Sequence, residues 1–219
     1  MKTVVLASQK GGAGKTTLAA HLAVAAEITG NGPVVLIDTD PQASLAAWWN
    51  GRKAETPVFA SVTLRELSDK LAALAKAHYA YVFIDTPPAI TESIRAVVKL
   101  ADFVLIPTRP SPHDLRAVGR TVDLVAETAR PFAFAVTQAK PNTRLTVQAV
   151  AALSAHGVVS PSIIHDRVDY AASMIDGRTV LEIDPRGRST SEVFELWSFI
   201  KERIAESTKV RKKQGTKYG

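Results

Sequence analysis

The sequence predicts an α/β fold: a three-layer, doubly wound, mostly parallel sheet with helices on both faces. Short runs rich in Val, Ile and Phe, apolar on both faces, recur along the chain, which is typical of strands buried in a parallel sheet. Segments with helical periodicity alternate with these runs, and this order favours right-handed strand–helix–strand crossovers. A chain of 219 residues can bury a full core, so we expect one domain over residues 1–206.

The apolar runs predict strands at residues 3–7, 33–37, 81–84, 103–106 and 132–136. Helices are predicted at residues 16–29, 92–100, 114–129, 143–156, 168–175 and 191–206. Another helix is indicated by a leucine repeat at helical spacing, formed by Leu64, Leu67, Leu71 and Leu74.

The last predicted helix, residues 191–206, carries an apolar stripe that indicates packing against a core. The stripe consists of Val193, Leu196, Trp197, Ile200 and Ile204. We expect Ser189 or Ser191 to cap this helix, with the acidic Glu192 in its first turn.

The composition excludes several functional classes. Cys is absent, which excludes disulfides, thiolate metal sites, cysteine nucleophiles and cysteine-ligated iron–sulfur clusters. No apolar run approaches the ~20 residues that span a bilayer, and no signal-peptide pattern precedes the first strand, so we expect a cytoplasmic protein. The net charge is +6, and five cations without any acid lie in residues 207–219, which we expect to form a basic, flexible tail.

A glycine-rich loop joins the first predicted strand to the first predicted helix, and it reads Lys10-Gly11-Gly12-Ala13-Gly14-Lys15-Thr16-Thr17. Its glycines let backbone N–H groups approach phosphate oxygens, and the helix N-terminus directs its positive end at the same anion. Lys15 is placed to reach the terminal phosphates, and the Thr16 hydroxyl suits a Mg²⁺ ligand. The loop therefore predicts a P-loop NTPase, although Gln9 stands where the standard pattern has a glycine.

Acidic residues follow two further predicted strands. Asp38 and Asp40 come after the second strand, and Asp85 ends the third. Ligands bind at the carboxyl ends of strands in open α/β sheets, where such acids hold Mg²⁺ or its water shell or orient the attacking water. An isolated Asp at a strand end is more often a turn or a helix cap, but three beside a P-loop favour a metal and hydrolysis site.

Together these residues resemble the ParA/MinD family of ATPases, whose P-loop deviates from the standard pattern. The resemblance lies in the glycine loop, in Asp38-Thr39-Asp40-Pro41-Gln42 and in the strand that ends at Asp85, and it extends through residues 106–112 and 167–177. It implies ATP and Mg²⁺ as cofactors and an ATP-dependent homodimer. Lys10 would be the signature lysine that acts in trans on the nucleotide of the partner subunit.

The resemblance also implies roles for the remaining site residues. Lys15 would act within its own subunit, and Thr16 would ligate Mg²⁺. Asp85 would support that metal site, Asp38 would lie near its hydration shell, and Asp40 would position the hydrolytic water.

For the adenine base, similar proteins use loops after a late strand. Here these loops contain Thr137 and Gln138, with His165 and Asp166 as further candidates. These residues could equally be ordinary polar groups of surface loops, and the sequence leaves both interpretations open.

Within this family the sequence favours the ParA branch. Iron–sulfur carriers and arsenite pumps need cysteines, and the guanine motif of signal-recognition GTPases is missing. The MinD branch binds membranes through a terminal amphipathic helix, but residues 209–219 offer only Val210 and Tyr218 as apolar groups, so we expect no membrane binding.

ParA-type dimers bind DNA without sequence preference, through cations that contact phosphates. The candidate DNA-binding residues are Arg167, Arg186, Arg188, Lys209, Arg211, Lys212 and Lys213. For the basic tail, a merely solubilising end remains the alternative.

These observations lead to one functional hypothesis and two alternatives. We expect a nucleoid-associated partition or positioning ATPase whose hydrolysis is stimulated by a ParB-like activator or a cargo adaptor. The alternatives are a MinD-like membrane-associated ATPase switch and a metabolic P-loop enzyme in which Lys10 has no role in trans. The sequence does not identify the cargo, because plasmid, chromosome and protein-cluster positioning share the same ATPase residues.

Overall fold

The computed structural model describes residues 1–215, with side-chain surroundings up to Lys209. Within that range one sheet contains six strands in the order β3-β2-β4-β1-β5-β6, and every neighbouring pair is parallel. The strands are β1 (Lys2–Leu6), β2 (Val34–Asp38), β3 (Val58–Phe59), β4 (Tyr81–Asp85), β5 (Phe103–Thr108) and β6 (Phe132–Val136). The predicted doubly wound fold is therefore confirmed, with a fully parallel sheet.

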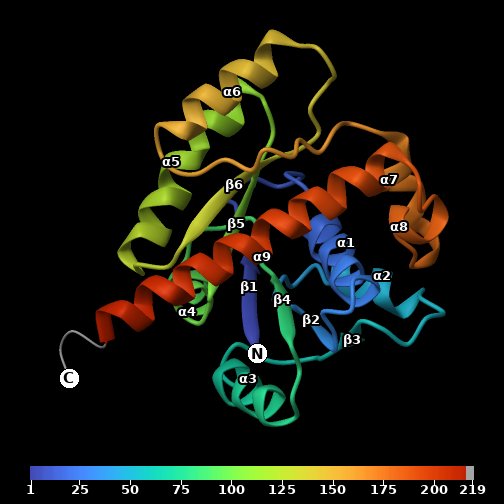
Figure 1. The fold of residues 1–219 in the computed structure, drawn as a ribbon, viewed down its shortest axis with the longest axis vertical. Helices are drawn as coiled ribbons and strands as arrows, with labels where there is room; N and C mark the ends of the chain where they lie inside the picture. The colour runs from blue at the N-terminus through green and yellow to red at the C-terminus, as the bar shows by residue number, and fades with distance from the viewer. Residues whose placement is uncertain (216–219) are drawn as a thin grey trace.

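Helices connect the strands and cover both faces of the sheet (Figure 1). They are α1 (Lys15–Ile28), α2 (Ser44–Asn50), α3 (Leu67–Lys76), α4 (Glu92–Lys99), α5 (Pro112–Glu127), α6 (Arg144–Ser154), α7 (Val168–Ser173), the 3₁₀ turn η1 (Met174–Asp176), α8 (Val180–Ile183) and α9 (Arg188–Gly215). Within the described residues no helix combines the length and apolarity needed to cross a membrane.

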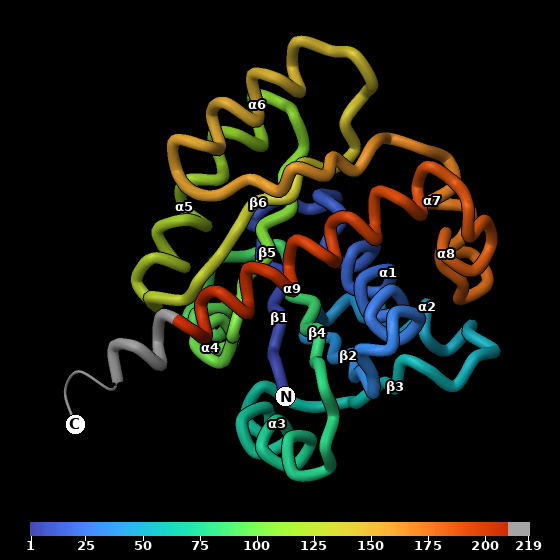
Figure 2. Tube along the Cα trace, viewed as in Figure 1, coloured from blue at the N-terminus to red at the C-terminus, as the bar shows by residue number. Residues whose placement is uncertain are grey.

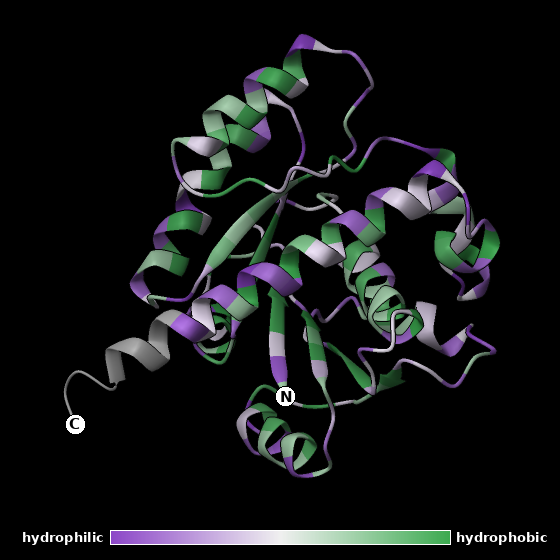
Figure 3. Cartoon of the chain, in the orientation of Figure 1, coloured by the Kyte–Doolittle hydropathy of each residue, from purple (hydrophilic) through white to green (hydrophobic). Residues whose placement is uncertain are grey.

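Two separate cores result from the alternation of side chains along the strands. Along β1, Val4 and Leu6 face a core that also contains residues of α1, α2, α8 and α9. Val5 faces the opposite core, which is completed by residues of α3, α4, α5 and α6. The strand side chains that face either core are fully buried, which is why the strands read as continuous apolar runs. Figure 3 shows the strands as mostly green.

The long helix α9 lies across the first of these cores. Its Trp197 ring is 4.9 Å from the Tyr81 ring and 5.8 Å from the Phe83 ring, both on β4. Figure 2 shows α9 running from the neighbourhood of α7 across β1 and β4. The predicted apolar stripe of α9 is entirely buried here, from Val193 to Ile204, so it is not available as a lipid-binding face.

The bounds of this helix correct two predictions. The helix begins at Arg188, after Gly187, so neither Ser189 nor Ser191 caps it and its first turn contains no acid. The helix also continues to Gly215, so the tail boundary predicted at residue 207 lies inside it, and only residues 216–219 fall outside the described structure. The charged stretch after Glu206 has no apolar stripe, which is why its helical character is not visible from periodicity.

The remaining differences are local. Leu64 precedes α3 and is 44% exposed, so it does not belong to the leucine face formed by Leu67, Leu71 and Leu74. The short elements β3, α2 and α8 were not predicted, because two to seven residues are too few for periodicity to show.

Candidate nucleotide-binding site

The glycine loop connects β1 to α1 at the carboxyl edge of the sheet, as predicted. Gly12 and Gly14 have φ angles of 72° and 90°, a left-handed conformation that side-chain-bearing residues rarely adopt. The chain can therefore curl tightly before α1 begins at Lys15. This arrangement directs the positive end of α1 into the concave side of the loop, as required for binding an anion.

Three side chains from the segments that directly follow β5 and β6 contact the carbonyl groups of this loop. Thr137 Oγ1 donates to the Ala13 carbonyl at 2.9 Å, and Gln138 Nε2 donates to the Gly12 carbonyl at 2.5 Å. Arg109 Nη2 lies 3.5 Å from the Gly11 carbonyl. These contacts turn the carbonyls outward and leave the loop's N–H groups for a ligand. Two residues proposed for adenine contact thus also brace the phosphate loop.

Lys15 is buried inside the loop, and its Nζ donates to the Lys10 carbonyl at 3.3 Å. Burial lowers the pKa of Lys15, while the nearby carboxylates of Asp85 and Asp40 act in the opposite direction. The structure thus brings the predicted cation and two of the three predicted acids into one electrostatic cluster.

Thr16 and Asp85 form the closest contact of the site. Thr16 Oγ1 donates to Asp85 Oδ2 at 2.5 Å, and Asp85 is almost fully buried. Burial raises the pKa of Asp85 to about 7; the charges of Asp38 and Asp40 add to this rise, and the Thr16 bond and Lys15 oppose it. The second oxygen, Asp85 Oδ1, is buried without a hydrogen-bond partner.

These features fit a Mg²⁺ ion. A hydroxyl, an unpartnered carboxylate oxygen and neighbouring acidic side chains are what a hard divalent cation requires. The described residues contain no cluster of three or more acidic or histidine side chains that could chelate a metal ion. Mg²⁺ usually keeps several waters and binds substrate phosphates, so Thr16 and Asp85 suffice as the protein's contribution.

Asp38 has a structural function that the sequence did not reveal. Its Oδ1 accepts from the Asp40 N–H at 2.9 Å, and its Oδ2 accepts from the N–H groups of Leu45 and Ala46 at 3.0 and 3.1 Å. Asp38 therefore satisfies the first N–H groups of α2. It also pairs in register with Asp85 on β4, so the two acids lie side by side. Its predicted role near a metal hydration shell stays a prediction.

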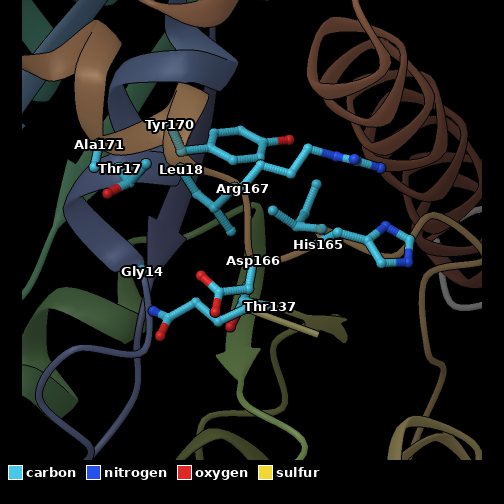
Figure 4. A pocket seen from close by; sticks show the side chains of 11 residues that line it. Gly14, Thr17, Leu18, Thr137, His165, Asp166, Arg167, Tyr170 and Ala171 are labelled. Carbon is cyan, nitrogen blue, oxygen red and sulfur yellow. The ribbon is translucent and has the colours of Figure 1, made fainter. Parts of the chain in front are cut away.

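A cavity of about 190 Å³ opens beside the start of α1 (Figure 4). Its lining consists of Gly14, Thr17, Leu18, Thr137, Gln138, Ile164, His165, Asp166, Arg167, Tyr170 and Ala171. In Figure 4, Tyr170 and Arg167 border one side, Asp166 and Thr137 the other, and the His165 imidazole points away from the cavity. The structure thus brings the proposed adenine contacts together, and it adds Tyr170, which only a three-dimensional view identifies.

Lys10 lies on the other side of the loop, at an open cavity of about 590 Å³. Arg109, His113, Lys140 and Asp166 are among the other residues around it. Arg109 is held by an ion pair with Asp114, at 3.0 Å between Nε and Oδ1. Lys10 thus borders open space, whereas Lys15 is enclosed by its own loop.

Among the proposed DNA-binding residues, those whose side chains the structure describes do not gather on one surface. Arg167 forms an ion pair with Glu192, at 2.8 Å between Nη2 and Oε1. Arg186 and Arg188 are exposed beside the start of α9, whereas Lys209 lies about 30 Å along the same helix at a rise of ~1.5 Å per residue. Arg211, Lys212 and Lys213 belong to the last turns of α9, and their side chains lie outside the described part.

The fold and the loop define a P-loop nucleotide-binding protein of the α/β class. The family model described as "CobQ/CobB/MinD/ParA nucleotide binding domain" matches residues 4–180, and the chain belongs to this family. A curated relative, "Maintenance of carboxysome distribution protein A" from Halothiobacillus neapolitanus, is 31% identical over 202 residues, covering 87% of this chain and 91% of the relative.

Solved structures agree with this assignment. A variant of McdA from Cyanothece in complex with ATP superposes with a TM-score of 0.73 at 20% identity, over 94% of this chain and 96% of that one. The MinC:MinD cell division complex from Aquifex aeolicus contains a chain that superposes with a TM-score of 0.75 at 19% identity, over 92% and 96%. At these identities the likeness concerns the fold alone, whereas the family match over residues 4–180 confirms the predicted relation to the ParA/MinD ATPases.

Proposed function

We propose that this protein is an ATP-driven positioning ATPase. ATP binding would pair two copies face to face, the paired state would bind DNA without sequence preference at the nucleoid, and a cargo-bound partner would stimulate hydrolysis and release. The observation that supports this proposal most strongly is the position of Lys10. It borders an open cavity of about 590 Å³, which leaves its side chain accessible to a second subunit.

In this proposal the two lysines of the loop act on the nucleotides of different subunits. Lys15 is buried in its own loop beside Asp85 and Asp40, so it acts on the nucleotide bound to the same chain. Lys10 reaches the nucleotide of the partner and adds a second positive charge against the charge that develops on the transferring phosphate. Hydrolysis is then fast only in the dimer.

Thr16 and Asp85 would hold Mg²⁺, which neutralises phosphate charge during hydrolysis. Asp40 is the proposed positioning group for the attacking water. One of its oxygens, Oδ1, accepts from the Gln42 N–H at 3.0 Å, which fixes the orientation of the carboxylate. Asp38 orients the same segment through its bond to the Asp40 N–H.

For the cargo we propose a protein assembly. The curated relative from Halothiobacillus neapolitanus is named for carboxysome distribution, and 31% identity over most of both chains supports a similar class of task. The activating partner would then be a cargo adaptor. A MinD-like membrane switch is less well supported, because the apolar stripe of α9 is buried in the core.

Duplex DNA retention in the presence of ATP, ADP and no nucleotide tests the proposal. We expect slow-migrating DNA complexes with ATP and a much weaker shift with ADP, and the ATP complex should weaken steeply as salt rises. Equal retention in all three states would contradict the nucleotide switch. Sedimentation with anionic liposomes in the same three states is the matched test of the membrane alternative.

A further inference from the structure

The carboxylate of Glu192 connects α9 to the wall of the smaller cavity. Glu192 is buried, and its Oε1 accepts from His165 Nδ1 at 2.8 Å and from Arg167 Nη2 at 2.8 Å. Its Oε2 accepts from the His165 N–H at 3.1 Å and lies 3.1 Å from the Tyr170 hydroxyl. One carboxylate therefore fixes three residues of a single segment, residues 165–170.

These three residues all line the cavity beside the phosphate loop. The opposite side of that cavity is formed by Gly14 and Thr17, where the loop turns into α1. A nucleotide whose phosphates sit in the loop would extend its base into this space, because the cavity adjoins the loop at Gly14 and Thr17. In Figure 4 the ring of Tyr170 and the side chain of Arg167 lie together on the side that Glu192 supports.

The groups that contact Glu192 suit a charged carboxylate and not a neutral amide. Burial alone would raise the pKa of Glu192, but bonds from Arg167, His165 and Tyr170 outweigh burial and lower it, so the group is ionised at neutral pH. The His165 N–H, the His165 ring and the Arg167 guanidinium donate to it, and the Tyr170 hydroxyl shares its proton between Glu192 and the Ser189 carbonyl, which lies 3.0 Å away. An amide in its place would present an NH₂ group to at least one of these donors and would leave that donor unsatisfied.

We propose that Glu192 is a positioning residue for the base of the bound nucleotide. It does not touch the nucleotide; it holds Arg167 and Tyr170 in the orientation in which they form one wall of the base pocket. The ligand class is a nucleoside triphosphate with a planar purine base. This inference rests on the proposed ATP-binding function and adds that base affinity, separately from triphosphate affinity, depends on α9.

Calorimetric titration of the full chain with Mg²⁺–ATP and with Mg²⁺–tripolyphosphate tests this separation. Glu192→Gln should bind ATP roughly tenfold more weakly, because the released Arg167 and Tyr170 side chains must be ordered on binding, while tripolyphosphate, which has no base, binds as before. KM for ATP should rise by a similar factor with kcat nearly unchanged. Glu195→Gln, an exposed glutamate on the same helix, is the matched control and should change neither affinity.

Two results would overturn the inference: unchanged ATP affinity in Glu192→Gln, or an equal loss of ATP and tripolyphosphate affinity. If Glu192→Gln does not fold, Arg167→Gln is the variant to titrate with both ligands, because Arg167 is partly exposed at the cavity rim. It should also lose ATP affinity and keep tripolyphosphate affinity, and unchanged ATP affinity would reject the inference. A wild-type chain that binds neither ligand would instead reject the proposed ATPase function.

Discussion

Thr16 and Asp85 meet across the nucleotide-binding site, with Thr16 Oγ1 donating to Asp85 Oδ2 at 2.5 Å while Asp85 Oδ1 is buried without a partner. The two residues come from the first turn of α1 and the last residue of β4. A contact between segments this distant in the sequence is produced only by the parallel pairing of β1 with β4, which places Leu6 opposite Asp85. The sheet itself therefore assembles the proposed metal site.

Asp85→Asn should weaken Mg²⁺ binding, because it removes the charge that the buried site needs. We expect the Mg²⁺ concentration for half-maximal ATP hydrolysis to rise roughly 10–100-fold, and chelation of the metal should abolish hydrolysis in the wild type. Asp123→Asn, an exposed acid on α5, is the control and should leave the Mg²⁺ dependence unchanged. An unaltered Mg²⁺ requirement in Asp85→Asn would remove Asp85 from the metal site.

His21 makes stability depend on pH below neutrality. Its Nδ1 lies 2.7 Å from the Thr17 carbonyl, and its Nε2 accepts from the Val180 N–H at 3.2 Å, so the neutral ring links α1 to α8. Full burial lowers the pKa of His21 from 6.5 to about 4. The unfolded chain therefore binds the proton first, and the stability that the neutral ring contributes is present above pH 6.5 and is lost as the pH falls towards 4.

Between pH 7 and pH 5 this effect should lower the free energy of unfolding by about 2 kcal/mol. Urea unfolding at several pH values measures it. His21→Gln should flatten the curve in this range, and His156→Gln, on the surface, should not. The same pH slope in wild type and His21→Gln would show that another group titrates.

The ion pair of Arg52 with Glu182 should matter for stability more than surface pairs do. Arg52 Nη2 lies 2.7 Å from Glu182 Oε1, and only 4% of the Arg52 side chain is exposed. Arg52→Met leaves Glu182 without its partner in a partly buried position, which should cost about 3 kcal/mol. Urea midpoints give the value, and Arg178→Gln, which breaks the exposed pair with Asp176, should cost less than about 1 kcal/mol. Equal losses in the two variants would contradict this ranking.

Asp38 should prove to be a helix cap as well as a member of the acidic cluster. Asp38→Ala removes the acceptor for the Leu45 and Ala46 N–H groups and should lower the free energy of unfolding by about 1–2 kcal/mol. Asp38→Asn keeps one carboxamide oxygen and should lose less. Thermal unfolding of both variants measures the difference, and full stability of Asp38→Ala would show that α2 does not depend on this cap.

Most of the fold could be predicted from the sequence because the five longer strands are buried on both faces and read as apolar runs. The site residues of the loop and of the strand ends were also predictable, since one strand–loop–helix pattern fixes where they lie. The contacts of Glu192 could not be predicted. The sequence suggested only that Glu192 lies in the first turn of a helix, whereas its partners, His165, Arg167 and Tyr170, lie on a separate segment. Such contacts depend on how α9 packs, which local periodicity does not encode.

The DNA-binding predictions were limited in the same way, because the sequence does not show which cations form ion pairs in the fold. In the sequence, Arg167 is one of several cations in loops. In the structure it forms an ion pair with Glu192. Arg186 and Arg188 remain exposed, and their effect on DNA retention stays a prediction.

The central claim is that Lys10 completes the active site of a second subunit. ATP hydrolysis per mole of protein, measured over a wide range of protein concentration, tests it most directly in the wild type, in Lys10→Ala and in Lys140→Ala, a neighbouring cation of the same cavity. We predict that the wild-type and Lys140→Ala rates rise with concentration as dimers form, and that Lys10→Ala stays at least about tenfold slower throughout. A rate independent of protein concentration, with Lys10→Ala as active as the wild type, would contradict the account.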